Sequence, residues 1–238
     1  MTAFLIALGI VFFLFLAHVF LLTTRHRRVE TAAFMTSPYA HRGLHGGDLP
    51  ENSLPAFCAA VACGFGIELD VQLSADGEVM VFHDESLLRM TGVDSSLYAK
   101  TKEELSALRL AGTEEKIPTL REVLALVDGK VPLLVEIKSD HAVLDVCAKT
   151  AEILDEYTGA YMIESFHPFA VNWFRKNRPH VVRGQLSANL FWHGKAALSL
   201  FVVENMLFNF LARPDFIAYD YHYKNSYSFL LCRFFHRP

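Results

Sequence analysis

Two acidic residues lie inside an otherwise apolar stretch, and their spacing suggests a shared site. Glu68 and Asp70 are two positions apart between Gly64 and Asp84. On a β-strand, residues two apart project from the same face, so both carboxylates would point the same way. An unpaired carboxylate in apolar surroundings costs several kcal/mol or more. The pair therefore indicates a bound cation.

Similar polar groups follow other short apolar runs. His41 and Arg42 come after Tyr39-Ala40, and His83 and Asp84 come after the run from Val79 to Phe82. Leu133-Leu-Val-Glu-Ile-Lys138 repeats the acidic pattern, with Glu136 and Lys138 two positions apart. Polar residues at the carboxyl ends of successive strands are typical of metal-dependent active sites in α/β barrels.

The elements that must position these residues alternate along the chain. The patterns predict strands at 38–42, 66–72, 78–82, 132–138, 161–165, 181–186 and 215–219. They predict helices at 53–63, 101–108, 119–127, 141–157 and 168–177, the third opened by a capping box of Thr119 and Glu122. Strands alternating with helices of this length indicate a mostly parallel sheet. The apolar segment 189–212 contains Lys195 and Glu204, so we expect a barrel helix or a lipid-facing lid rather than a second membrane span.

The N-terminus is the most apolar part of the chain. The run from Ala3 to Leu22 contains one His and one Gly and no charged residue. About 20 such residues match the hydrocarbon thickness of a bilayer. A cleaved signal peptide fits less well, because nothing basic precedes the run and no small-residue cleavage pattern follows it. We expect a transmembrane anchor at 1–24 and a basic juxtamembrane linker at 25–37. The arginines after the span predict that the C-terminal domain is cytoplasmic.

Charge and cysteine content narrow the function classes. The net charge is −4, but three arginines and no acids lie in residues 1–28, so the remainder carries −7. An acidic domain without basic tracts argues against a nucleic-acid partner. The four cysteines show neither metal-type pairing nor a disulfide framework, and we interpret them as reduced structural thiols.

Five motifs in order resemble one known family. They are His41-Arg42-Gly43, Pro50-Glu51-Asn52-Ser53, Glu68-x-Asp70, His83-Asp84 and Glu136-Ile-Lys138. This set is similar to the glycerophosphodiester phosphodiesterase family of metal-dependent TIM barrels. The resemblance is good over residues 38–140 and thinner over 160–220, where Ser165-Phe166 still fits. It implies a (β/α)8-type barrel at 38–238.

The C-terminal part departs from the family pattern. The family's closing strand signature is absent, and only about 200 residues follow the anchor, whereas an eight-stranded barrel typically takes about 250. We therefore expect a barrel that lacks its last one or two βα units.

The resemblance implies roles for the polar residues. Glu68, Asp70 and Glu136 would be metal ligands, and three hard oxygen donors suit Mg²⁺ or Ca²⁺ rather than zinc. The alternative is a buried ion-pair cluster with Arg42 and Lys138. His41 and His83 would be the general acid and base, since histidine exchanges protons near neutral pH. The remaining assignments are Arg42 and Lys138 on the phosphate, Glu51 in substrate binding, Asn52 as a helix cap or a partner of the site, and Asp84 orienting a neighbour or capping a loop.

These roles predict metal-dependent hydrolysis of glycerophosphodiesters to glycerol 3-phosphate and an alcohol. The membrane anchor leaves a lysophospholipase D acting on membrane lysolipids as an alternative. The expected loss of C-terminal units leaves a second alternative, a membrane-tethered barrel that binds phosphodiesters without turnover. A phosphoinositide-type phospholipase C is the least favoured, because such barrels usually lack this set of acids.

Overall fold

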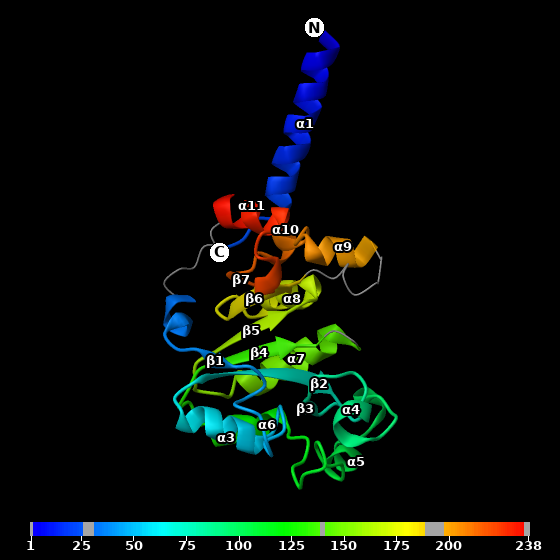
Figure 1. Cartoon of the computed structure of the whole chain (residues 1–238), viewed down its shortest axis with the longest axis vertical. Coiled ribbons are helices and arrows are strands. Elements are labelled where there is room, and N and C mark those ends of the chain that lie inside the picture. Colours follow the sequence, from blue (N-terminus) through cyan, green and yellow to red (C-terminus); the bar gives the residue numbers. More distant parts are fainter. Residues whose placement is uncertain (1, 26–30, 139–140, 189–197, 236–238) are drawn as a thin grey trace.

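The chain forms one curled, mainly parallel β-sheet (Figure 1). The structure is a computed structural model that describes residues 2–25, 31–138, 141–188 and 198–235. The sheet order is β1-β2-β4-β5-β6-β7, with all neighbours on this path parallel. The strand bounds are β1 (Tyr39–Ala40), β2 (Gly66–Leu73), β4 (Leu133–Ile137), β5 (Tyr161–Ser165), β6 (Val182–Ser187) and β7 (Phe216–Tyr219). This half-barrel is consistent with the TIM-type architecture that the sequence predicts.

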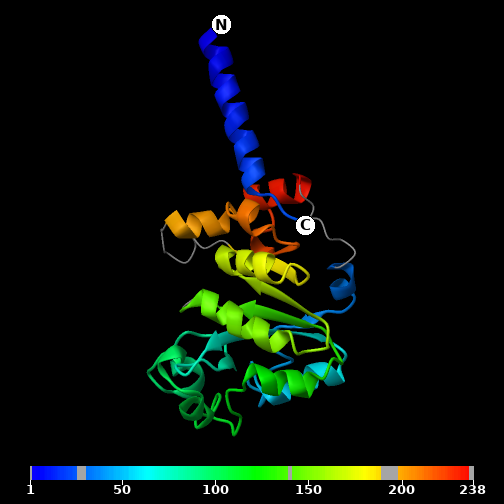
Figure 2. The ribbon, with the colours of Figure 1, turned by 180° about the vertical axis from the view of Figure 1, so that it is seen from behind.

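Helices between the strands cover the outer face of the sheet. They are α3 (Leu54–Ala62), α6 (Leu120–Val127), α7 (Val143–Leu154) and α8 (Pro168–Asn177). The last three lie over the sheet when the molecule is viewed from behind (Figure 2). Their apolar faces pack on the strands in a core that includes Phe57, Val135 and Phe174. Thr119 and Glu122 form the expected capping box at the start of α6.

One strand returns in the opposite direction. β3 (Val79–Val81) pairs antiparallel with the last residues of β2, so His83 approaches the site from a returning strand. The chain then continues through α4 (Leu88–Thr91), η2 (Leu97–Ala99) and α5 (Lys102–Ser106). This excursion, residues 74–118, has a hydrophobic cluster of its own around Met80, Leu97 and Leu105.

A long N-terminal helix projects from the other end of the molecule. Helix α1 (Thr2–Leu21) contains the one segment of the described chain that is long and apolar enough to cross a bilayer, Phe4–Leu21 with a mean hydropathy of 2.8. At its base lie α9 (Leu198–Glu204), α10 (Asn209–Ala212) and α11 (Tyr227–Phe235) (Figure 1). The short turns η1 (Ala33–Met35) and η4 (Tyr221–Tyr223) complete the described elements.

Parts of two predicted segments fall outside the described residues. They are the basic residues His26, Arg27 and Arg28 of the linker and residues 189–197 of the aromatic segment. Within the rest of 189–212, the structure has the two short helices α9 and α10. The four cysteines are free thiols in the structure, with Cys147 and Cys232 buried and Cys58 and Cys63 exposed.

The interior of the sheet also buries an ion pair. The Arg183 side chain on β6 is fully buried, and its Nη1 lies 3.6 Å from Asp215 Oδ2. The Arg183 backbone amide donates to the same carboxylate at 3.1 Å. Since a cation buried this deeply needs a partner, Asp215 helps to fix β6 beside β7.

Candidate active site

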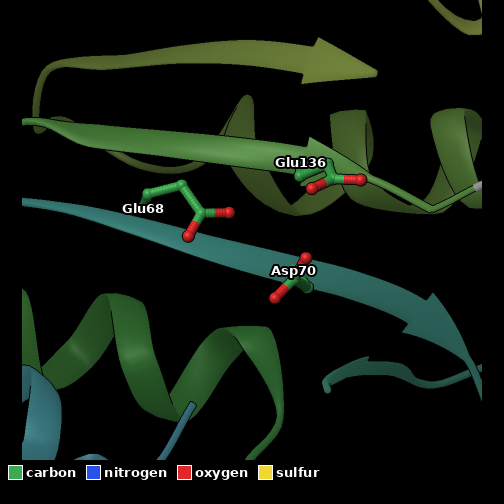
Figure 3. Close-up of side chains that lie close together, drawn as sticks. All are labelled: Glu68, Asp70 and Glu136. Atoms are coloured by element: carbon green, nitrogen blue, oxygen red, sulfur yellow. The ribbon is translucent and has the colours of Figure 1, made fainter. Parts of the chain in front are cut away.

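Three carboxylates converge on one face of β2 and β4 (Figure 3). Glu68 and Asp70 come from β2, and Asp70 lies directly opposite Glu136 of β4. All three residues are buried, and one oxygen of each lies within 4.8 Å of the others. The two-residue spacing and the parallel register together bring the predicted ligand set into one cluster.

Arg42 and Lys138 lie against these acids. Lys138 Nζ is 3.0 Å from Glu136 Oε1 and 3.3 Å from Asp70 Oδ1. Arg42 Nε is 3.6 Å from Asp70 Oδ2. Burial alone would lower the pKa of Lys138, but Glu136 and Asp70 outweigh it and raise that pKa, so the ammonium stays charged. The ion pairs considered as an alternative are thus present.

A fourth buried carboxylate extends the row, and the sequence reasoning missed it. Glu164 on β5 lies opposite Glu136 of β4, and its Oε2 has no hydrogen-bond partner among the described residues. On its other side Glu164 faces Gly184, whose missing Cβ leaves room for the Phe216 ring. Burial, and then the charges of Glu136 and Asp70, raise the pKa of Glu164 to about 8. The only signal in the sequence was an acid directly before Ser165-Phe166.

The charges of this cluster fit a divalent cation. Burial, followed by the charge of Asp70, raises the pKa of Glu68 well above its ordinary value. Burial raises the pKa of Glu136 to about 7, even with Lys138 acting in the other direction. Among the described residues, four buried carboxylates face two cationic side chains, Arg42 and Lys138, which leaves two negative charges when all are ionised. Hard oxygen donors with such an excess are the ligands that Mg²⁺ and Ca²⁺ take in proteins.

The turn after β1 carries His41 and Arg42, two of the predicted site residues. Arg42 has a left-handed backbone with φ 56°, and Gly43 follows with φ 80°. A Cβ on Gly43 would lie 2.9 Å from the backbone of Ala56 in α3, so the turn and the helix can approach only with glycine here. This conformation aims the Arg42 amide at Glu68 Oε2, where it donates a 2.9 Å hydrogen bond.

Asn52 holds Asp70 from the other side. It is buried with φ 54°, and its Nδ2 donates to Asp70 Oδ2 at 2.8 Å. Capping of α3 falls to the next residue, Ser53, whose hydroxyl accepts from the Ala56 amide. Of the two roles considered for Asn52, the structure shows the contact with the acidic cluster, and Ser53 is the helix cap.

An arginine that the sequence did not single out joins Glu51 and Asp84. Arg89 of α4 donates to both oxygens of Glu51, at 2.6 and 3.1 Å, and its Nε donates to Asp84 Oδ2 at 2.5 Å. Glu51 also accepts from Arg42 Nη1 at 2.9 Å. These hydrogen bonds outweigh burial and lower the pKa of Glu51, so it is an anion that positions two arginines.

The two histidines are held differently. His83 Nδ1 lies 2.6 Å from Asp84 Oδ1, and Gln72 Nε2 donates to the carbonyls of Phe82, His83 and Asp84. Asp84 thus orients its neighbour, as predicted. The His41 side chain is 68% exposed, with Nε2 4.0 Å from Glu68 Oε2. Partial burial, and then the charge of Arg42, lower the pKa of His41, which keeps the ring neutral at pH 7.

Comparisons with known proteins agree with this geometry. The model of the glycerophosphoryl diester phosphodiesterase family matches residues 41–214. A glycerophosphodiester phosphodiesterase of Caldanaerobacter subterraneus subsp. tengcongensis is 34% identical over 188 residues, which cover 72% of this chain and 76% of the relative. A lysophospholipase D of Homo sapiens is 31% identical over 153 residues, which cover 59% of this chain and 47% of that protein.

A solved structure supports the same relationship. It is an Oleispira antarctica phosphodiesterase in complex with the product sn-glycerol-3-phosphate, 29% identical, with a TM-score of 0.62. The match covers 68% of this chain and 72% of that one. The fold, the order of the five motifs and the extent of the match lead to one conclusion: the chain belongs to the glycerophosphoryl diester phosphodiesterase family.

Proposed function

We propose that this protein hydrolyses glycerophosphodiesters to glycerol 3-phosphate and an alcohol, using a divalent cation and two histidines. The observation that carries the proposal is the convergence of Glu68, Asp70 and Glu136, with two cationic side chains beside them. The phosphodiesterases named above support the substrate class, and one of them binds the expected product.

The carboxylates of Glu68, Asp70 and Glu136 would hold Mg²⁺ or Ca²⁺. Such an ion neutralises charge that develops on the phosphate and lowers the pKa of an attacking hydroxyl. Arg42 and Lys138 lie at the edge of the cluster and would contact the remaining phosphate oxygens, as a planar fork and a point charge respectively. Glu51 would contribute to substrate binding through Arg42, which it orients.

The histidines would move the protons. His41 is neutral at pH 7 because its pKa is lowered, so it is suited to remove the proton from the nucleophile. His83, oriented by Asp84, would protonate the leaving alkoxide. The nucleophile is either water, which would give glycerol 3-phosphate in one step, or the neighbouring glycerol hydroxyl, which would give a cyclic phosphate that water opens in a second step. Each step needs one proton removed from the nucleophile and one delivered to the leaving oxygen, and the two histidines would serve both.

The test is release of glycerol 3-phosphate from glycerophosphocholine by the full-length chain in a mild detergent. Release should require Mg²⁺ or Ca²⁺, stop with EDTA, and be lost in Glu68→Ala. His41→Ala and His83→Ala should each remove most turnover with the fold intact. His45→Ala is the matched control, because this exposed histidine lies in the neighbouring loop without an assigned role. Near-native rates in either His41→Ala or His83→Ala would contradict the acid–base assignment.

A lysophospholipase D activity is the second candidate, and helix α1 favours it. A catalytic domain held at a bilayer meets lysolipids at high local concentration, and the human relative carries that name. Choline release from lysophosphatidylcholine and from glycerophosphocholine, measured under the same conditions, separates the two substrate classes. Release of choline from the lysolipid and not from glycerophosphocholine would favour the second.

The proposed organisation is an anchor at 1–24, a linker at 25–37 and a catalytic domain at 38–238 on the cytoplasmic side. The basic residues after the apolar helix support this orientation. The exposed thiols of Cys58 and Cys63 provide the test. A membrane-impermeant maleimide should label them in inside-out vesicles and not in right-side-out ones. The reverse pattern would place the domain on the other side.

A further inference from the structure

The base of helix α1 is packed into the rest of the protein. Leu22, directly after the helix, is fully buried in a cluster with Met206, which lies between α9 and α10, and with Cys232 of α11. Cys232 Sγ lies 3.7 Å from the Leu22 carbonyl oxygen. Farther along, the Arg25 amide donates to the Pro214 carbonyl at 2.8 Å. These contacts fix the direction of α1 relative to the domain.

Aromatic contacts continue upward along α1. Phe20 lies 5.8 Å from Phe210, measured between ring centroids, and His18 stacks on Tyr227 at 5.9 Å. Phe15 meets Phe235 edge to face at 6.0 Å. Because a helix rises 1.5 Å per residue, Phe15 lies about 10 Å above Leu22.

These contacts place the C-terminal end of α11 beside the apolar span. Phe15, His18 and Phe20 all belong to the segment Phe4–Leu21 that is long enough to cross a bilayer. Helix α11 lies at the foot of α1 in both views (Figures 1 and 2). If α1 crosses a bilayer, Phe235 is therefore close to the same lipid.

Helix α11 is apolar on its outer face as well as its inner one. Ser228 and Cys232, four residues apart, are buried against the domain. Tyr227, Leu230 and Phe234 share the opposite side at helical spacing, and they are 64%, 45% and 71% exposed. A helix that is apolar on both sides is normally surrounded by apolar material. Apart from the stacking of Tyr227 on His18, these exposed side chains leave the outer face largely open in the described part of the chain.

The charges around this helix suit phospholipid head groups. Arg233 is the one charged residue of α11, and it is exposed. Lys224 lies 4.0 Å above the ring of the exposed Tyr221. No acidic residue occurs from Tyr221 to Phe235. Aromatic rings together with lysine and arginine are typical of segments at a membrane–water interface.

We propose that α11 is an interfacial helix whose outer face, Tyr227, Leu230 and Phe234, is buried in the phospholipid bilayer that α1 crosses. The domain then rests against the membrane at two fixed points, with a set orientation. This inference rests on the proposed insertion of α1. It does not depend on the catalytic assignment.

The test uses the full-length chain with an environment-sensitive NBD dye on one cysteine, reconstituted in phosphatidylcholine nanodiscs. Cys58→Ser and Cys63→Ser remove the exposed thiols, whereas Cys147 and Cys232 are buried, and burial raises the pKa of each to about 12, which prevents labelling.

Three single-cysteine positions are compared. Phe234→Cys reports on α11, and Phe12→Cys reports on the span. The matched control is Leu88→Cys on α4, an exposed leucine of a short helix at the far end of the domain (Figure 1). A thermal unfolding transition at the temperature of the unlabelled parent shows that each labelled variant is folded.

The dye at position 234 should emit at shorter wavelength and be quenched at least about twofold by nitroxide-labelled lipid, since an interfacial helix lies about 5–10 Å into the head-group region. The dye at position 12 should also be quenched, and the dye at position 88 should not. Quenching at 12 but not at 234 would overturn the inference and leave the anchor standing. A wavelength shift at 234 without quenching by lipid would overturn it too, because a protein surface would then cover the helix. Absence of quenching at 12 would refute the anchor and the inference together.

Discussion

Replacing Glu164 by Gln is expected to stabilise the cation-free protein at neutral pH. The pKa of the buried Glu164 carboxyl is raised from 4.5 to about 8 by burial and by the neighbouring acids. Between these two values the folded state keeps a proton that the unfolded state releases. Stability from this group is therefore full below pH 4.5 and is lost progressively as the pH rises from 4.5 to 8. Glutamine has nearly the same shape as a protonated glutamate and does not ionise in this pH range.

The size of the effect follows from the pKa difference. One pKa unit corresponds to about 1.4 kcal/mol. The proton that the folded protein keeps on Glu164 at pH 7 therefore lowers its free energy of unfolding by about 3 kcal/mol relative to pH 4.5. For a protein of this size each kcal/mol shifts the melting temperature by about 2–4 °C. Glu164→Gln should therefore melt roughly 10 °C higher than the parent protein at pH 7, and the two should converge near pH 4.5.

The assay is thermal unfolding of the full-length chain in one detergent with EDTA, from pH 4.5 to 8. Glu152→Gln on the exposed side of α7 is the matched control, because it removes the same charge in water. A difference between Glu164→Gln and the parent that stays constant with pH would refute the reasoning, as would equal effects of the two variants. Saturating Mg²⁺ or Ca²⁺ should remove the advantage of glutamine, since a nearby cation favours the ionised carboxylate.

Three further changes have defined outcomes. Asn52→Ala removes the amide that holds Asp70 and should weaken Mg²⁺ or Ca²⁺ binding at least about tenfold in calorimetric titration; unchanged affinity would show that the contact does not orient the carboxylate. Asp215→Ala removes the carboxylate beside the buried Arg183 guanidinium and should lower the free energy of unfolding by about 3–5 kcal/mol in urea, whereas a loss below 1 kcal/mol would mean that the remaining partners of Arg183 suffice. Thr119→Ala removes the α6 cap and should lower the free energy of unfolding in urea by about 1 kcal/mol, with turnover preserved. Lost turnover at unchanged stability would contradict a purely structural role for Thr119.

Local patterns were sufficient for the sheet and for the acids at its centre. The strand around Glu68 and Asp70 was predicted because spacing along one strand decides which side chains share a face. Glu136 joined them because neighbouring parallel strands end together, and the register puts it opposite Asp70.

Other features depend on contacts that no local pattern contains. Glu164 belongs to the acidic row only through the register of β5 beside β4, and one acid near a strand end is not distinctive by itself. Arg89 reaches Glu51 across 38 residues through an excursion whose path the sequence does not reveal. Helix α11 packs against Leu22, 210 residues before Cys232. These pairings are decided by tertiary packing.

The separate hydrophobic cluster of the excursion, residues 74–118, has a consequence for how substitutions affect this enzyme. The carboxylates are built into the sheet, whereas His83 and its partners Asp84 and Arg89 belong to a lobe with its own interior. Substitutions in that interior would shift His83, the proposed proton donor, while the carboxylates of the sheet stay in place. Changes in the interior of this lobe should therefore alter the rate of bond cleavage more strongly than the affinity for the proposed cation.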